Sequence, residues 1–321
     1  MEIFAGKIAV VTGGGTGMGR ELVCQLAAQG CHVATCDVSA TAMAETLDAA
    51  LDCATEGARV TTFLADVSQE SELISWRTQI ERDFQTSTIN LLFNNAGIAG
   101  GGSMISDERE RWERTFNVDW GGVYLSTRTF LPMLLAADEG HIVNTSSING
   151  IFASIGPFSP HTSYSAAKFA VRGFSEALIA DLRVNAPHVR VSVVCPGHVG
   201  TSIVLNSAAA HGQDSQSLSS EELVRIRRRL ALSGTPVDDV SDEDLRKGVQ
   251  VMGEAFRDFA PVTAAAAAAI ILDGVRNNQW RILVGDDAVG ADRAVREDPE
   301  GAYEPEFYRE LQSRGIFDGL N

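Results

Sequence analysis

Along most of the chain, short β-branched segments alternate with segments of helical periodicity. We interpret the β-branched segments as strands at 7–12, 32–36, 59–64, 89–93, 141–145, 190–194 and 280–284. Between them we expect helices at 21–29, 40–55, 70–84 and 111–135, and a further helix that carries Tyr164. Repeated strand–helix units of this length imply a parallel sheet with helices on both faces. The sequence therefore predicts an α/β fold built on a doubly wound parallel sheet of about seven strands.

The first predicted strand leads directly into a glycine-rich turn, and a helix follows. After Thr12 the turn reads Gly13-Gly14-Gly15-Thr16-Gly17-Met18-Gly19. Glycines allow a tight turn and a close approach to a pyrophosphate, which then meets the N–H groups of the helix N-terminus. The spacing is Gly-x-x-x-Gly-x-Gly, not the common Gly-x-Gly-x-x-Gly. A turn without a ligand is the alternative, but its place between a strand and a helix favours a dinucleotide site.

The second predicted strand ends in Asp37, where a carboxylate would meet the ribose hydroxyls of an adenosine. An acid at this place favours NAD over NADP, because a 2′-phosphate would face an unpaired carboxylate. No Arg or Lys lies in the glycine turn or directly after Asp37. The alternative is that Asp37 caps the following helix, a role that Ser39 suits as well.

Other polar residues follow the later strands of the predicted sheet. Ligands of such sheets bind at the carboxyl ends of the strands. The residues that we expect at this edge are the glycine turn, Asp37, Asp66, Asn94 to Gly97, and the pair Ser146 and Ser147.

Tyr164 and Lys168 lie four residues apart, which places them on one face of a helix. A tyrosine has an ordinary pKa near 10, so it accepts a proton at neutral pH only if its anion is stabilised, as a nearby ammonium does. The pair can therefore act as an acid and base. Taken alone, the same spacing arises by chance on many helices.

Composition excludes several classes of function. The net charge of -16 opposes binding to nucleic acid or to anionic membranes. No apolar run approaches the ~20 residues that span a bilayer, and no N-terminal targeting signal is seen, so we expect a soluble cytoplasmic protein that does not bind membranes. The five cysteines lack paired spacing and the six histidines are isolated, so we expect no metal site.

We expect one domain over 1–321, in which 5–201 and 261–285 form the core. Residues 202–260 read as two amphipathic helices, one opened by a capping box at Ser219 and Glu222, and we interpret the segment as a substrate lid inserted before the last helix–strand unit. Thr263 should cap the Ala-rich helix that follows. Residues 286–321 read as a polar C-terminal extension.

Several motifs in order make the chain similar to a known family. It resembles the short-chain dehydrogenase/reductase family over about residues 5–285, which implies a single-domain, Rossmann-type fold that uses NAD. The motifs that carry the resemblance are Thr12-Gly13-x-x-x-Gly17-x-Gly19, Asn94-Asn95-Ala96-Gly97, Asn117, Ser147, Tyr164-x-x-x-Lys168 and Pro196-Gly197-x-x-x-Thr201.

The resemblance implies a catalytic role for four residues. Tyr164 would be the general acid and base, and Lys168 would lower its pKa and hold the nicotinamide ribose. Ser147 would bond the substrate oxygen, and Asn117 would support a water next to Lys168. Ser147 and Tyr164 lie farther apart than is usual in the family, which leaves Ser146 as a rival for the catalytic hydroxyl.

The resemblance also implies a cofactor site for NAD and a family function. We expect NAD to be bound by Gly13, Gly15, Thr16, Gly17, Met18, Gly19, Asp37, Val38, Asp66, Val67, Asn94, Ala96, Gly97, Tyr164, Lys168, Pro196, Gly197, Val199 and Thr201. The expected partner is a small molecule, namely a bulky, hydrophobic secondary alcohol or its ketone. Family members usually pair through the helices that bear Asn117 and Tyr164, so we expect a homodimer or a homotetramer.

Apolar residues near the lid suggest the walls of a substrate pocket. Besides Ser147, we expect the substrate to contact Ile151, Phe152, Phe158, His198, Ile203, Val204 and Leu205. Two other functions stay open at this point. One is a lyase or epimerase that retains NAD, and the other is a non-catalytic dinucleotide sensor, which would have no need of the acid and base.

Overall fold

The structure is a computed structural model that describes the chain except for residues 2, 155–158, 213–217, 233–234, 238 and 317–321. Seven parallel strands form its central sheet in the order β3-β2-β1-β4-β5-β6-β9. The strands are β1 (Ile8–Thr12), β2 (His32–Asp37), β3 (Val60–Leu64), β4 (Leu91–Asn94), β5 (Gly140–Thr145), β6 (Val189–Pro196) and β9 (Arg281–Val284). The order reverses between β1 and β4, which is the switch point where such sheets bind ligands. The predicted Rossmann-type fold is confirmed.

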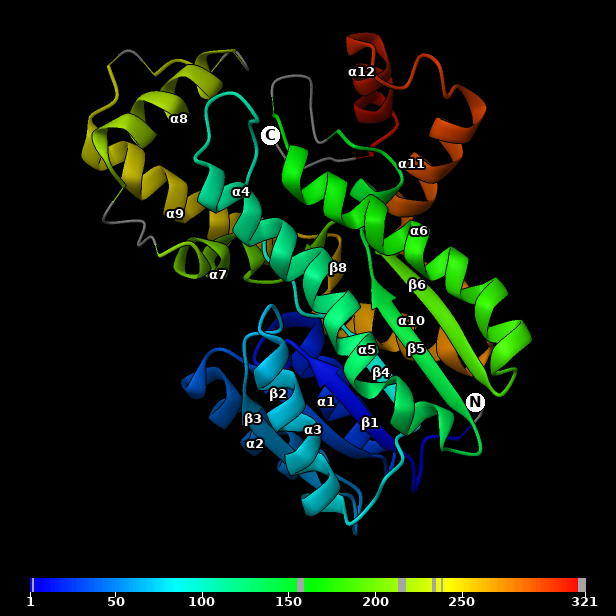
Figure 1. Cartoon of the computed structure of the whole chain (residues 1–321). Helices are drawn as coiled ribbons and strands as arrows, with labels where there is room; N and C mark the ends of the chain where they lie inside the picture. The colour runs from blue at the N-terminus through cyan, green and yellow to red at the C-terminus, as the bar shows by residue number, and fades with distance from the viewer. Residues whose placement is uncertain (2, 155–158, 213–217, 233–234, 238, 317–321) are drawn as a thin grey trace.

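Helices cover both faces of the sheet (Figure 1). One face carries α1 (Gly17–Ala28), α2 (Ala40–Cys53) and α10 (Ala264–Arg276), and the other carries α3 (Glu70–Phe84), α4 (Arg109–Phe116), α5 (Gly122–Leu135) and α6 (Thr162–Asn185). Side chains of β1 show why helices pack on both faces of the sheet. Val11 joins the apolar cluster of α1 and α10, whereas Val10 joins the cluster of α3 and α5, and both are fully buried.

The helix predicted over 111–135 is not uniform. Between α4 and α5 the chain makes a π-helical turn, η1 (Asn117–Gly121). Such a turn contains one residue more than an α-helical turn and is frequent at functional sites. It changes which side chains of this helix face the protein interior.

The segment 202–260 contains three described helices, not the two that we expected. These are α7 (Ile203–Ala210), α8 (Ser220–Leu232) and α9 (Asp242–Asp258). The predicted capping box is present, because Glu222 N–H donates to Ser219 Oγ and Ser219 N–H donates to the Glu222 carboxylate. Thr263 caps α10 as predicted. The short strands β7 (Val199–Gly200) and β8 (Val262–Thr263) pair in parallel and bring the two ends of the segment together.

The expected polar tail is folded into two helices, α11 (Asp286–Glu297) and α12 (Pro305–Ser313). Its apolar residues pack on the short 3-10 helix η2 (Ile148–Gly150) and on β6, in a third apolar cluster. Figure 1 shows α11 and α12 at the same end of the molecule as α8 and α9, beyond the carboxyl ends of β5 and β6. Among the described helices, none is long and apolar enough to cross a membrane.

Candidate active site

The glycine turn forms a cradle at the N-terminus of α1. Gly13 and Gly17 have φ values of 66° and 55°, which favour glycine, and a Cβ at Gly19 would overlap the Gly13 carbonyl oxygen. Thr16 precedes α1 without capping it through its side chain, so the first-turn N–H groups have no side-chain acceptor there. Close backbone, free N–H groups and a helix N-terminus fit a pyrophosphate.

The loop after β4 is bonded to this cradle. Thr12 Oγ1 accepts the N–H groups of Asn95 and Ala96 over 3.0 and 3.1 Å, and Asn95 Nδ2 donates to the Gly13 carbonyl. The side chain of Asn94 points away from the cradle, into the interior, where Nδ2 donates to Asn144 over 2.8 Å. Of the residues predicted here, Ala96 therefore borders the glycine turn, whereas Gly97 lies beside Asp119 and Lys168.

Asp37 faces the glycine turn from the end of β2. Its Oδ2 accepts the Gly15 N–H over 3.0 Å. The alternative that Asp37 caps α2 does not hold, because the capping oxygen belongs to Ser39. Val38 is mostly exposed beside it. Arg20, the cation after the turn, is already bonded to the Gly15 carbonyl and to Glu45.

Asp66 and Val67, which we expected to bind NAD, have other contacts. Asp66 accepts the Ser68 N–H and hydroxyl and pairs with Arg114 over 2.7 Å. Burial raises the pKa of Asp66, but these bonds outweigh it and hold the pKa below its usual value. Val67 is buried against Gly122 of α5.

Three predicted catalytic residues converge at the carboxyl end of β5. The Ser147 hydroxyl lies close enough to Tyr164 to lower its pKa, and Lys168 Nζ lies 5.3 Å from the centre of the Tyr164 ring. Lys168 is 3% exposed and donates to the Thr145 carbonyl over 3.2 Å. Ser146 points elsewhere, since its Oγ donates to the Lys168 carbonyl over 2.7 Å. The serine at Tyr164 is therefore Ser147.

Burial raises the pKa of Tyr164 above its ordinary value, and Asp119 raises it further. Lys168 and the Ser147 hydroxyl act in the opposite direction. Lys168 thus lowers the pKa of Tyr164 as we expected, but its effect does not outweigh that of burial.

Asn117 does not reach this group of side chains. It is exposed and borders a surface hollow with Ser68 and Arg114, on the opposite side of η1 from Lys168. Asp119 takes the place that we expected for Asn117, because its Oδ2 lies 3.8 Å from Lys168 Nζ. Sequence reasoning missed Asp119. The available signal was helical spacing. Asp119 lies four residues after Thr115 and four before Val123, and both of these are buried.

The segment after β6 lies partly at the cradle. Thr201 faces the glycine turn, because a Cβ at Gly17 would lie 3.0 Å from Thr201 Cγ2. Pro196 ends β6, and Val199 is buried in the core. Gly197 and His198 lie against Asp287 of α11, which accepts the His198 N–H over 2.6 Å.

Four of the predicted substrate contacts have other packing partners. Phe152 is 1% exposed and packs on Phe307 of α12, and Ile151 belongs to the same cluster. The ring of His198 is bonded to the Phe256 carbonyl of α9 over 2.7 Å. On α7, Leu205 packs on α9, whereas Ile203 and Val204 are partly exposed. Phe158 lies outside the described residues.

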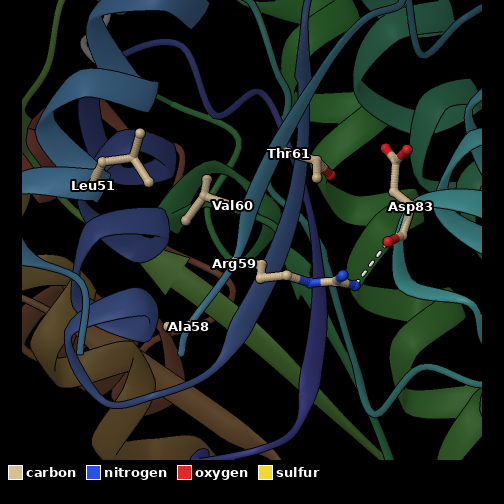
Figure 2. Close-up of a pocket in the computed structure, with 6 residues that line it drawn as sticks. All are labelled: Leu51, Ala58, Arg59, Val60, Thr61 and Asp83. Carbon is tan, nitrogen blue, oxygen red and sulfur yellow. Dashed lines mark hydrogen bonds between the residues drawn. The ribbon is translucent and has the colours of Figure 1, made fainter. Parts of the chain in front are cut away.

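Two surface hollows of the described chain lie away from the Tyr164 group. One of about 440 Å³ lies at the amino end of β3, where Arg59 reaches the Asp83 carbonyl over 2.8 Å (Figure 2). Another of about 310 Å³ is the hollow bordered by Asn117. The first hollow lies at the wrong end of its strand for a ligand of this fold, and neither is lined by an acid and base pair. The site is therefore defined by the convergence of Ser147, Tyr164 and Lys168 beside the glycine turn.

This fold and this site define a Rossmann-type enzyme with a dinucleotide cradle and a Ser, Tyr and Lys group. The family model described as short chain dehydrogenase matches residues 7–211. The chain belongs to the short-chain dehydrogenase/reductase family, and it is an oxidoreductase of that family.

The similarity to known proteins extends beyond the part of the chain that the family model matches. A Mycobacterium tuberculosis protein that carries the name oxidoreductase SadH is 33% identical over 92% of each chain. Estradiol 17-beta-dehydrogenase 11 of Rattus norvegicus is 29% identical over 68% of this chain and 70% of its own. Among solved structures, a short chain dehydrogenase/reductase from Burkholderia phymatum in complex with NAD has a TM-score of 0.75 at 27% identity and covers 95% of this chain and 98% of its own. A metagenomic short-chain oxidoreductase in complex with NADP has a TM-score of 0.53 at 26% identity and covers 61% of this chain and 84% of its own.

Proposed function

We propose that the protein is an NAD-dependent dehydrogenase that interconverts a bulky, hydrophobic secondary alcohol and its ketone. The observation that carries this proposal is the convergence of Ser147, Tyr164 and Lys168 at the carboxyl end of β5, on the same sheet edge as the glycine cradle. An acid and base next to a dinucleotide cradle is the arrangement that hydride transfer at an alcohol carbon requires.

Each residue of the group has a separate task in the proposed reaction. Tyr164 accepts the proton of the alcohol in oxidation and returns it in reduction. Ser147 donates a hydrogen bond to the substrate oxygen and so holds it at the phenol. Lys168 stabilises the phenolate and would bind the ribose. When bound, NAD⁺ supplies the nicotinamide carbon that accepts the hydride.

Asp37 supports the choice of NAD over NADP. Its carboxylate lies at the end of β2 and is fixed against the glycine turn by the Gly15 N–H. A ribose 2′-hydroxyl can donate to such a carboxylate, whereas a 2′-phosphate would be repelled by it. Arg20 does not relieve this repulsion, since it is paired with Glu45.

The segment 202–260 supports the proposal that the substrate is hydrophobic. This segment leaves the core directly after Thr201, and the partly exposed apolar side chains of Ile203 and Val204 begin it. An apolar surface at this place would bind a substrate mainly by burying apolar area, which contributes about 25 cal/mol per Å². The steroid dehydrogenase among the relatives is named for a substrate of this class.

A panel of steroid, terpene, aryl and aliphatic alcohols, each tested with NAD⁺ and with NADP⁺, would test the proposal. Steady formation of NADH with a bulky secondary alcohol is the expected result. One equivalent of NADH without turnover would favour a lyase or epimerase that retains NAD. No reduction with any alcohol, and no oxidation of NADH by the matching ketones, would contradict the proposal.

A further inference from the structure

Asp119 is a buried carboxylate whose one ionic partner is Lys168 among the described residues. The side chain is fully buried, and Oδ1 accepts the Ile98 N–H over 2.8 Å. Oδ2 lies 3.8 Å from Lys168 Nζ and accepts no hydrogen bond in the described part of the chain. A buried carboxylate costs several kcal/mol unless it is paired, so the ammonium of Lys168 is what makes this placement tolerable.

The backbone nearby leaves room for this pair. A Cβ at Gly97 would lie 3.2 Å from both Asp119 Oδ1 and Lys168 Nζ. Any larger residue at Gly97 would therefore press on both charged groups. Gly97, the π-helical turn and the helix of Lys168 therefore meet closely around this ion pair.

Three ionisable groups from two elements lie near one another here. Tyr164 and Lys168 come from α6, and Asp119 comes from η1. The ring of His161, at the start of α6, lies 4.7 Å from the Tyr164 ring and is the other titratable group at the phenol. Burial raises the pKa of Asp119 to about 6 although Lys168 lowers it, so the carboxylate is mainly ionised at neutral pH.

We propose that Asp119 is a positioning residue that, as the counter-ion of Lys168, sets the pH at which Tyr164 becomes an effective base. The positive charge of Lys168 is shared between the phenol and the carboxylate, so less of it stabilises the phenolate. A neutral residue at 119 would leave the full charge to Tyr164. This inference rests on the proposed function only for its kinetic consequence.

Asp119→Asn is the matched change, because an amide oxygen can still accept the Ile98 N–H while the charge is lost. We expect the ascending limb of the pH profile of kcat/KM for alcohol oxidation to move to lower pH. At a fixed pH on that limb, the rate should rise about threefold or more. Asp119→Ser removes the same charge with a smaller side chain and should move the limb in the same direction.

The control is Asn117→Asp, which adds a carboxylate on the exposed side of the same turn and should leave the profile unchanged. A second readout does not need turnover. The chain has four tyrosines, so the resonance of Tyr164 can be assigned in NMR of ring-labelled protein by its loss in Tyr164→Phe. Tyr164 should ionise at lower pH in Asp119→Asn and in Asp119→Ser than in the wild type.

These readouts separate the two claims. A wild type that oxidises no alcohol would contradict the proposed function, yet the tyrosine titration would still test the role of Asp119. If Tyr164 titrates at the same pH in the wild type and in both neutral variants, or if Asn117→Asp shifts it as strongly, the proposed role of Asp119 is wrong.

Discussion

Asn206 of α7 donates a hydrogen bond from Nδ2 to Thr16 Oγ1 over 3.0 Å, so α7 rests on the glycine cradle. The same helix is bonded to the loop after β4, where Ser207 Oγ accepts the Ala99 N–H over 2.7 Å. His211 adds a bond of 3.0 Å to the Ala99 carbonyl. α7 and its C-cap therefore contact two of the loops that would bind the cofactor.

Asn206→Ala should weaken cofactor binding. An exposed neutral hydrogen bond contributes about 0.5–1 kcal/mol, so we expect Kd for NADH to rise about two- to fivefold. Asn185→Ala is the control, because it removes a similar exposed bond at the far end of α6.

In the wild type, hydrogen exchange over 203–210 should slow when NADH and a ketone bind. Unchanged exchange there would reject the lid and favour a rigid extension of the core.

Asp37→Asn should reduce the preference for NAD. We expect the wild type to prefer NAD⁺ over NADP⁺ about a hundredfold or more in kcat/KM, equivalent to ~2.7 kcal/mol. The amide keeps an acceptor for the Gly15 N–H but removes the negative charge, so the gain should appear mainly with NADP⁺. A wild type that uses both cofactors equally would show that Asp37 does not face the ribose.

Phe307→Ala should destabilise the protein. The Phe307 ring is buried against Phe152, with the ring centres 5.6 Å apart, and loss of such a side chain costs about 3 kcal/mol or more. Phe259→Ala is the control, because Phe259 is 81% exposed and its loss should cost less than ~0.5 kcal/mol. Urea unfolding of the two variants measures the difference. Equal stabilities would mean that α12 does not pack on the core.

His141 should make the protein sensitive to acid. Burial lowers the pKa of His141 from 6.5 to about 3, and its Nε2 is bonded to Ser192 Oγ over 2.7 Å. Because the folded pKa lies below the unfolded one, stability is present above about pH 6.5 and is lost as the pH falls toward 3. At pH 4.5 the loss should be about 2–3 kcal/mol relative to pH 7.5. His141→Gln should lack this part of the pH dependence in urea unfolding, and an identical loss in both proteins would contradict the assignment.

The strands and the glycine cradle could be predicted from sequence because their signals are local. In β1, for example, a β-branched run ends directly in the glycine turn. The choice between Asn117 and Asp119 could not be made in that way. Two positions two residues apart point to different sides of a helix, and the π-helical turn that selects Asp119 has no clear sequence signature.

The C-terminal extension shows a second limit. Its composition is polar, but Ala288, Ala291 and Ala294 lie at helical spacing and form the buried side of α11. Small residues give a weak hydrophobic signal, so the sequence alone does not reveal the buried face of α11. Because the extension packs on Phe152, it occupies one wall that we had assigned to the substrate. Contacts between segments so far apart in sequence depend on the tertiary fold.

Single-turnover hydride transfer in Tyr164→Phe tests the central claim most directly. The change removes only the phenolic oxygen, so NADH should bind with a Kd within about threefold of the wild type. The rate of NADH formation from bound NAD⁺ and alcohol should fall about a hundredfold or more, since general base catalysis contributes at least that much. A rate close to that of the wild type, with cofactor binding intact, would contradict the assignment of Tyr164 as the acid and base.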